Sequence, residues 1–405
     1  MLLFAVVAAV GWAYRARHAG FGLAPDVVTV SITNPDDLGP GTLREALFIA
    51  AAANERASVV IRARKITLRT PLPPLVNPHG LMIIAEPAGA EIDAGMLGGG
   101  AVFDVVGDNT TIAGVVLRNC KGTAVLLRAA HFHLQSSTIE SCDVGVDIAP
   151  NAAHLLIERN LFQGDRIGVR FAAPEVDAAV AGNAFRQARL AGVWAVRGDA
   201  AGRDAADGAI DVRDDRFIGD NSGVVAGNVP ILVENDDFSG DGPDAAVHLV
   251  GADAVVRNNR IGDSGAQGIV AEMAGGAVIE GNVLTRLRLY GIVVRDSAGA
   301  LVRDNRMEDC AAGMAFVLGD PARPSTAQGN LVVGPTLDGI DVIGASPRLL
   351  DNQVLRPHAL ALHVVDYDPA TGPSVRARPS LSGNNFRPNA LPASPSVARA
   401  VVRQP

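Results

Sequence analysis

A column of ten Asn and Asp residues recurs along the chain, and this repeat constrains the fold more than any other feature of the sequence. Its members are Asn160, Asn183, Asp215, Asp236, Asn259, Asn282, Asn305, Asn330, Asn352 and Asn384. Seven of the nine intervals between them measure 21 to 25 residues, and the other two measure 32, which is one repeat plus a nine-residue loop. A fixed period of this length is typical of solenoid proteins, in which each repeat packs only on its neighbours.

The residues around each Asn predict short strands joined by tight turns. Apolar residues flank the Asn, and further along each repeat comes a Gly-apolar-x-apolar segment, as in Gly168-Val-Arg-Phe and Gly291-Ile-Val-Val. Alternation with a period of two indicates half-buried strands. Asn tolerates the left-handed turn conformation, and Asn side chains stacked about 4.8 Å apart could hydrogen-bond from coil to coil. The sequence therefore predicts an all-β solenoid of parallel strands, with about 12 regular coils over residues 106–387.

The segments before the regular coils predict a capping helix and a first stretch of irregularly spaced strands. Residues 42–54, which begin Thr42-Leu-Arg-Glu-Ala-Leu, have helical periodicity and good helix formers. We expect this helix to cover the first coil, because a terminal repeat must shield the open core from water. Irregularly spaced strand-like runs follow up to Val106. One β-helix domain over residues 26–387 is expected, and the Pro-, Ala- and Ser-rich residues 388–405 are expected to form a flexible tail.

The first 25 residues are expected to direct export. Met1 to Tyr14 form an apolar run that precedes Arg15 and Arg17. Fourteen residues are fewer than the roughly 20 that a membrane-spanning helix needs. The run is similar to the apolar region of a signal peptide, although it lacks the positive segment that normally precedes it. We expect a signal peptide or a membrane anchor, and hence a periplasmic, membrane-anchored or secreted protein. An ordinary buried helix is the alternative.

The Asn repeat behind the Gly41-Thr-Leu-Arg-Glu-Ala helix resembles the pectate-lyase-like superfamily of right-handed parallel β-helices. The resemblance covers residues 30 to 387. It implies a single-stranded right-handed β-helix, and a ligand groove beside the strand with the Gly-apolar-x-apolar pattern. Its members act on or bind carbohydrates, so a polysaccharide or oligosaccharide partner is implied. The repeat is specific for the fold but gives almost no information about activity, because a fold alone does not determine a function.

The x residue of the Gly-apolar-x-apolar strand points outward, and polar residues gather at the two ends of this outward column. One group holds Asp147, Arg170, Trp194 and His248, and the other holds Asp341, His363 and Asp366. From the first group we predict a catalytic set, with His248 as the base, Arg170 neutralising the substrate and Asp147 as a carboxylate. Nearby residues predicted to bind substrate are Trp194, Arg166, Arg189 and Asp244. The alternative is a surface ion pair between Asp147 and Arg170 across neighbouring coils.

The turns before these strands carry oxygen ligands that could hold Ca²⁺. Asp220, Asn221 and Asp241 offer the carboxylate and amide oxygens that Ca²⁺ prefers. The alternative is that these side chains only cap their turns. The loop at 198–208 also holds Asp and Gly, but it lacks the terminal Glu of a helix-loop-helix calcium site, and we interpret it as a solvated surface loop.

The three cysteines occupy one register, each three residues after an apolar position. Cys120 and Cys142 should therefore be stacked on adjacent coils. Either they form a disulfide, which an exported protein allows, or they are two free thiols that fill the turn. Cys310 lies several coils away.

Charge and motifs narrow the function without fixing it. The net charge is −8 and the cations are scattered, so a nucleic-acid partner, which needs a concentrated positive face, is not expected. The paired-Asp signature of polygalacturonase-like hydrolases, the Asp-Pro-His-Asp of alginate epimerases and the Arg-x-Pro-x-x-Arg of pectate lyases are all missing. We predict an exported β-helix that binds or modifies a polysaccharide, as a lyase, epimerase or glycoside hydrolase if it is an enzyme. A non-catalytic structural or adhesin-like scaffold is the alternative.

Overall fold

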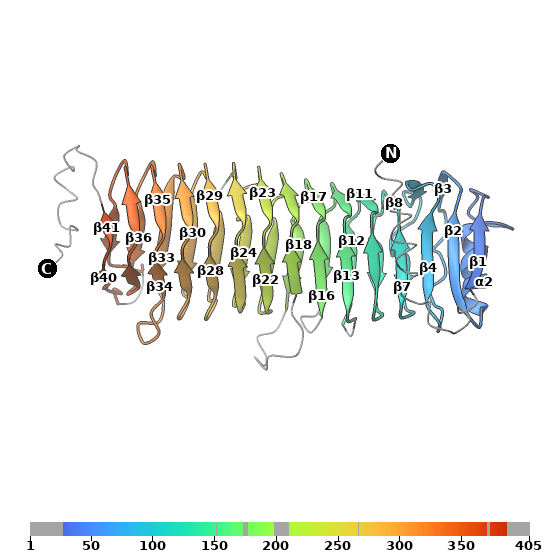
Figure 1. The fold of residues 1–405 in the computed structure, drawn as a ribbon, viewed down its shortest axis with the longest axis horizontal. Helices are drawn as coiled ribbons and strands as arrows, with labels where there is room; N and C mark the ends of the chain where they lie inside the picture. Colours follow the sequence, from blue (N-terminus) through green and yellow to red (C-terminus); the bar gives the residue numbers. More distant parts are fainter. Residues whose placement is uncertain are drawn as a thin grey trace, which may run out of the picture.

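The computed structural model describes residues 27–150, 152–172, 177–197, 210–265, 267–370 and 373–386. Within these ranges the chain winds into a rod of three parallel sheets, and every coil except those at the two ends contributes one strand to each sheet (Figure 1). The predicted leader at residues 1–25, the tail at 388–405 and the loop at 198–208 lie outside the described residues. No helix of the described part is long and apolar enough to cross a membrane.

Sheet A has 15 strands, which pair in chain order. They are β1 (Val27–Ile32), β2 (Arg56–Ile61), β4 (Leu81–Ala85), β7 (Thr110–Ala113), β10 (His133–Gln135), β13 (Leu155–Glu158), β16 (Ala178–Ala181), β19 (Ile210–Arg213), β22 (Ile231–Glu234), β25 (Ala254–Arg257), β28 (Val278–Glu280), β31 (Leu301–Arg303), β34 (Thr326–Gln328), β37 (Arg348–Leu350) and β40 (Ser380–Ser382).

Sheet B has 14 strands, and one of them follows every sheet A strand except β1 after a short turn. They are β3 (Lys65–Thr67), β5 (Ala90–Asp93), β8 (Val115–Arg118), β11 (Thr138–Glu140), β14 (Leu161–Gln163), β17 (Ala184–Arg186), β20 (Arg216–Ile218), β23 (Asp237–Ser239), β26 (Arg260–Gly262), β29 (Val283–Thr285), β32 (Arg306–Glu308), β35 (Leu331–Val333), β38 (Gln353–Leu355) and β41 (Asn385–Phe386).

Sheet C has 12 strands and contains the Gly-apolar-x-apolar segments. They are β6 (Ala101–Val105), β9 (Thr123–Leu127), β12 (Val144–Ile148), β15 (Ile167–Phe171), β18 (Ala191–Val196), β21 (Val224–Gly227), β24 (Val247–Val250), β27 (Ile269–Glu272), β30 (Tyr290–Arg295), β33 (Ala312–Val317), β36 (Ile340–Ile343) and β39 (Leu362–Val365). The predicted all-β solenoid of parallel strands is confirmed.

The helix expected at 42–54 is present as α2 (Leu43–Ala52), and it packs against β1 and β2 at one end of the rod (Figure 1). Thr42 is the N-cap, and its hydroxyl accepts a hydrogen bond from the Glu45 amide. Glu45 in turn accepts a hydrogen bond from the Gly41 amide, which satisfies a second amide at the helix start. The face formed by Leu43, Ala46, Leu47 and Ala50 is buried, as expected of a helix that covers an open core.

The Asn column forms the predicted ladder in the turns between sheets A and B. The side-chain oxygen Oδ1 of Asn183 accepts hydrogen bonds from the backbone N–H and the side-chain amide of Asn160. The residue before each rung adopts a positive φ, for example Arg159 at 54°, so the two-residue turn bends sharply and directs the Asn side chain inward. The ladder therefore satisfies polar groups inside the rod that would otherwise have no partner.

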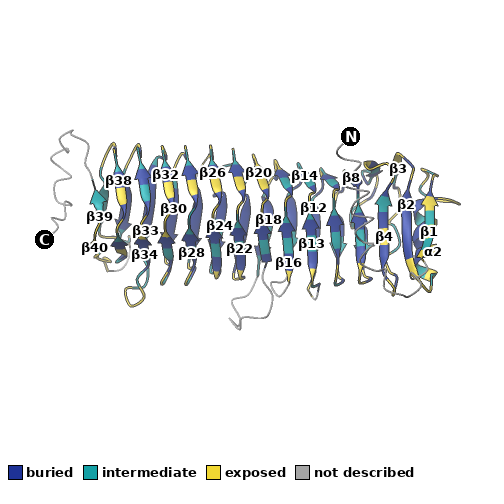
Figure 2. Cartoon of the chain, viewed as in Figure 1, coloured by how far each residue is buried: buried dark blue, intermediate teal, exposed yellow. Residues whose placement is uncertain are grey.

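Buried positions, dark blue in Figure 2, run along the whole described rod, and apart from the ladder and a few turn residues their side chains are apolar. Four phenylalanines of sheet B, Phe162, Phe185, Phe217 and Phe238, stack with ring centroids 4.6 to 4.9 Å apart. In the turns between sheets B and C, Cys120 and Cys142 form a disulfide between adjacent coils, which is one of the two expected alternatives. Cys310 is a buried free thiol.

Candidate functional site

The outward column of sheet C is continuous in the structure, so the residues singled out from the sequence can be placed strand by strand. Backbone pairing puts the outward residues in the order Asp147, Arg170, Trp194, Val225, His248, Val270, Val293, Ala315, Asp341 and His363. Parallel strands lie about 4.8 Å apart, so the number of strand steps between two residues gives their separation along the rod.

The residues predicted near the start of this column form cross-strand ion pairs. Arg170 Nε and Nη2 lie 2.8 Å and 2.5 Å from the two carboxylate oxygens of Asp147. Arg166 holds Asp143 on the same two coils, with Nε 2.7 Å from Oδ1, and this bond lowers the pKa of Asp143. Each of these two arginines is therefore already engaged by a carboxylate, as the ion-pair alternative expected for Asp147 and Arg170.

His248 lies away from this arginine segment. Trp194 and Val225 separate it from Arg170, and three strand steps correspond to about 14 Å. His248 instead lies between two carboxylates, with Nδ1 3.8 Å from Asp244 Oδ1 and Nε2 3.5 Å from Glu272 Oε2. The structure thus brings Asp147 and Arg170 together, brings His248 and Asp244 together, and does not join the two groups. The catalytic roles given to them remain predictions.

The Asp residues predicted as calcium ligands turn inward. Asp220 and Asp241 are 0% and 2% exposed, and each accepts a backbone hydrogen bond from the preceding coil, from Ala188 and Asp220 respectively. The second carboxylate oxygen of each has no hydrogen-bond partner. Burial raises the pKa of Asp220 to about 7 and that of Asp241 to about 8. Neither side chain faces the outer surface on which a substrate would lie.

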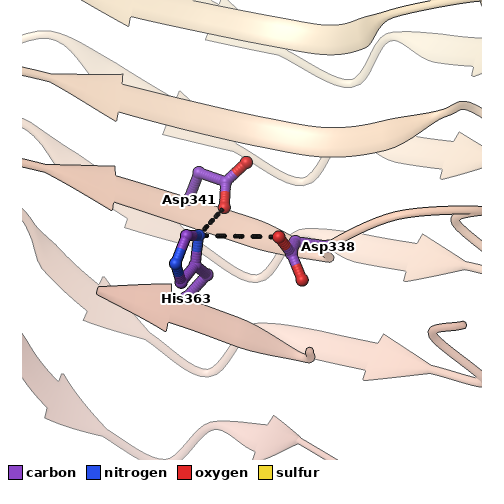
Figure 3. A group of neighbouring side chains, drawn as sticks. All are labelled: Asp338, Asp341 and His363. Carbon is purple, nitrogen blue, oxygen red and sulfur yellow. Dashed lines mark hydrogen bonds and ion pairs between the residues drawn. The ribbon is translucent and has the colours of Figure 1, made fainter. Parts of the chain in front are cut away.

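Two residues of the second group, Asp341 and His363, belong to a connected set of polar side chains on sheet C (Figure 3). On neighbouring strands β36 and β39, His363 Nδ1 lies 3.0 Å from Asp341 Oδ1 and 3.5 Å from Asp338 Oδ2. The Tyr290 hydroxyl donates a 2.6 Å hydrogen bond to the other oxygen of Asp341. Asp338 is held in its turn because its Oδ1 accepts a hydrogen bond from the Leu360 amide. We call Tyr290, Asp338, Asp341 and His363 the His363 cluster.

Burial divides the His363 cluster into a buried support and two accessible groups. Asp341 is 4% exposed, and its burial raises its pKa, although the bonds from Tyr290 and His363 oppose this. Burial and the bond to Asp341 also raise the pKa of Tyr290, so its hydroxyl stays protonated. The side chains of Asp338 and His363 are 20% and 32% exposed. A neutral His363 that donates from Nδ1 to Asp341 carries its lone pair on Nε2, and this is the arrangement of a base oriented by a carboxylate.

Two members of the His363 cluster were not predicted from the sequence. Tyr290 occupies the first position of β30, one residue before the Gly of the repeat, and reaches Asp341 across 51 residues of chain. Asp338 lies in a turn, one residue before Gly339. The proximity of Asp341 and His363 followed from the outward column. Asp366, grouped with them from the sequence, instead accepts a hydrogen bond from the Ala377 amide in the following loop.

A strip of small apolar side chains connects His248 to the His363 cluster. Ala245, Val270, Val293 and Ala315 lie on the outer side of sheet C, yet they are only 2% to 6% exposed. Tyr290 and Val317 pack against them. Burial to this degree means that neighbouring side chains, Tyr290 and Val317 among them, cover most of each of these residues. His248 and Asp341 are four strand steps, or about 19 Å, apart along it.

These features define the chain as a right-handed parallel β-helix protein with a polar cluster on the outer face of one sheet. The family described as the right handed beta helix region matches residues 204–354. A search of curated proteins finds no match.

Among solved structures, the catalytic unit of an α-1,3-glucanase from Streptomyces thermodiastaticus has a TM-score of 0.54 and 14% identity, covering 91% of this chain and 70% of that one. The A-module of a mannuronan C-5 epimerase from Azotobacter vinelandii has a TM-score of 0.50 and 11% identity, covering 88% and 100%. At these identities the similarity shows the fold, and both neighbours are polysaccharide-active β-helix enzymes.

Proposed function

We propose that this protein binds and modifies a polysaccharide on the outer face of sheet C, with the His363 cluster as its reaction centre. The observation that carries the proposal is the position of the His363 ring, which is held by Asp341 and Asp338 while its Nε2 edge is left for a ligand. The fold similarity to two polysaccharide enzymes supports the substrate class. Because a fold hosts many functions, the substrate class alone could not assign the site.

The cluster can transfer a proton to or from a bound sugar. His363 Nε2 is the group that would take or give the proton, and Asp341 stabilises the imidazolium that forms when it takes one. Tyr290 fixes Asp341 by donating to its second oxygen, so that Asp341 keeps one direction towards His363. Asp338 lies on the exposed side of His363 and would accept a hydrogen bond from a substrate hydroxyl or water. Proton transfer of this kind serves lyase, epimerase and hydrolase chemistry alike.

Export to the periplasm, the membrane surface or the medium is part of the proposal. The disulfide between Cys120 and Cys142 supports it, because structural disulfides persist mainly in oxidising compartments. An exported protein would also meet its polysaccharide substrate in one of these locations.

The test is a panel of neutral and acidic glycans incubated with the protein and with His363→Ala. Products are followed by reducing-end release and by the ultraviolet absorbance of unsaturated uronate. His133→Ala is the matched control, because His133 also bonds a carboxylate, with its Nε2 3.1 Å from Glu158, but does so on sheet A. We expect His363→Ala to reduce turnover at least about 100-fold, in line with the loss of a general acid or base, and His133→Ala to leave it unchanged.

The same panel separates this proposal from the other candidate arrangements. Loss of turnover in His248→Ala but not in His363→Ala would move the reaction centre to the site predicted from the sequence around His248. Binding without turnover in every protein would indicate a recognition module. No binding to any glycan would contradict the proposed function and favour a structural scaffold.

A further inference from the structure

The pairing of charges along sheet C differs from one segment of the rod to another, and this difference bears on which glycans the protein can accept. In the segment around β15 and β18, Arg166 and Arg170 pair with Asp143 and Asp147, and Arg189 and Trp194 lie beside them. In the segment from β24 to β39, no arginine among the described residues pairs with Asp244, Asp338 or Asp341. The His363 cluster and the apolar strip both lie in this second segment.

The carboxylates of the second segment surround the apolar strip. Asp244 and Glu272 flank His248 at one end, with side chains 49% and 24% exposed. Asp338 and Asp341 lie at the other end. Arg295 is bound to Glu272, with its Nη1 2.6 Å from Oε1, so the charges of these two side chains largely offset each other.

Other arginines lie in the turns of this segment. Arg286 and Arg288 are exposed in the turn that leads into β30, where Arg286 is bound to Asp263, and Arg356 is exposed in the turn before β39. Among the described residues, none of these three arginines forms an ion pair with a carboxylate at either end of the strip.

We infer that the sheet C face between His248 and His363 takes a neutral polysaccharide and rejects polyuronates. This inference rests on the proposed function. A polyuronate carries one negative charge on each sugar, and a chain laid over about 19 Å of the strip would bring several of these charges near Asp244 and Asp338. A neutral sugar carries no such charge, and it has hydroxyls that the carboxylates at the ends of the strip can accept from. Val270, Val293 and Ala315 place no charged group between the two ends.

The fold itself does not dictate this choice. Of the structural neighbours, one is named as an α-1,3-glucanase and another as a mannuronan epimerase, so the fold occurs in proteins named for neutral and for acidic polysaccharides. The selection therefore has to come from side chains, and electrostatic complementarity is the usual way to suppress a wrong partner.

The experiment measures binding of the full chain to neutral glucans and to alginate and polygalacturonate, each at 20 mM and 200 mM salt, with EDTA and with added Ca²⁺. We expect neutral glucan to bind with little dependence on salt, and polyuronates in EDTA to bind at least about 10-fold more weakly at 20 mM salt. Repulsion between like charges is strongest when screening is weakest, so the preference should narrow at 200 mM salt.

Asp244→Lys is the variant that tests the cause, because Asp244 lies at the margin of the strip and outside the His363 cluster. We expect it to strengthen polyuronate binding at 20 mM salt about three-fold or more, while neutral glucan binding stays the same or weakens, because Lys cannot accept the hydroxyl hydrogen bonds that Asp244 accepts. The matched control is Asp253→Lys, which makes the same charge change at an exposed position just before the sheet A strand β25.

Tight polyuronate binding in EDTA would overturn the inference and leave the proposed function standing. Polyuronate binding that appears only with Ca²⁺ would also overturn it, since the carboxylates would then be holding a bridging cation. Failure of every glycan to bind would contradict the proposed function itself. The three outcomes differ, so the two proposals can fail separately.

Discussion

The ladder inside the rod contains two kinds of rung, and the comparison between them shows what the Asn side chain supplies. An Asn rung such as Asn282 accepts through its oxygen from the rung before it, and donates through Nδ2 to the Val256 carbonyl and to the oxygen of Asn305. Asp215 and Asp236 occupy the same register and accept through Oδ1 in the same way. Their Oδ2 atoms stand where Asn has its donor, and they are buried without a hydrogen-bond partner.

An Asp rung differs from an Asn rung because it lacks the amide hydrogens that Asn donates. An ionised carboxylate can only accept, so two oxygens meet where the Asn ladder has a donor and an acceptor. A protonated carboxyl restores the donor. Burial raises the pKa of both Asp215 and Asp236 well above the ordinary value, which favours this neutral form. The charged groups around them are mainly acidic, Asp211, Asp214 and Glu234, with Arg213 and Arg257 as the cations.

The largest expected effect is on the pH dependence of the whole protein. Five buried carboxyls that face the interior of the rod have raised pKa values, namely Asp165, Asp215, Asp220, Asp236 and Asp241. Their unfolded forms titrate near 3.8 and the folded forms near 7 to 8 where a value is resolved, so the folded state binds more protons between these limits. The stability that these five carboxyls contribute is therefore fully present below pH 3.8 and is lost as the pH rises towards 8.

Thermal unfolding should show this loss directly. We expect stability to fall by on the order of 5 kcal/mol between pH 5 and pH 9, and Tm by roughly 10 °C. Carboxylates with lowered pKa values, such as Asp143, contribute stability that is lost only as the pH falls below 3.8, so they do not affect this window. A Tm that is constant or rises from pH 5 to pH 9 would show that the buried carboxyls are ionised without penalty.

Converting an Asn rung to Asp should reproduce the defect in an intact part of the ladder. Asn282→Asp removes the donors to Val256 and Asn305 and leaves a buried oxygen unsatisfied. We expect a loss of about 3 kcal/mol at pH 8 and a smaller loss at pH 5, measured by thermal and urea unfolding. Asn258→Asp is the control, since Asn258 is exposed in the same kind of turn, and Asp already occupies this position at Asp214 and Asp304. Equal effects of the two variants would contradict the argument.

Converting the two Asp rungs to Asn should have the opposite sign. Asp215→Asn with Asp236→Asn completes the ladder, and we expect a gain of about 2 kcal/mol at pH 8 with little change at pH 5. The two changes are neighbours and should be made together, because their effects will not add. Asp214→Asn alters an exposed carboxylate beside them and serves as the control. If the stability of the double variant depended on pH as that of the unaltered protein does, groups other than Asp215 and Asp236 would bind the protons.

The sequence predicted the fold well because the turn imposes the same requirement on every coil. Asn recurs wherever a left-handed turn and an inward donor are both needed, so the register could be read without the structure. The capping helix could be predicted for a similar local reason, since Thr42 accepts from the Glu45 amide and Glu45 accepts from the Gly41 amide. These features depend on neighbours a few residues or one coil away.

The site was harder to predict, because its contacts depend on the direction and length of side chains. His363 and Asp341 could be placed together from the outward column, but Tyr290 reaches Asp341 over two strands, which spacing does not reveal. The inward direction of Asp220 and Asp241 did leave a signal. Each follows an inward Phe by three residues, as Cys142 follows Ile139, so the register that aligned the cysteines applies to these Asp residues too.

The smallest effect is expected in this second inward column, in the turns between sheets B and C. Asp241 accepts from the Asp220 amide, and Ala188 and Leu287 interrupt the column, so no continuous ladder depends on it. Asp241→Asn keeps the acceptor and adds a donor, and we expect a gain of about 1 kcal/mol at pH 8 by thermal unfolding. Asp237→Asn, an exposed carboxylate at the start of β23, is the control. A gain as large as that from the double ladder variant would mean that any buried carboxyl has the same cost, and that the continuity of the ladder does not matter.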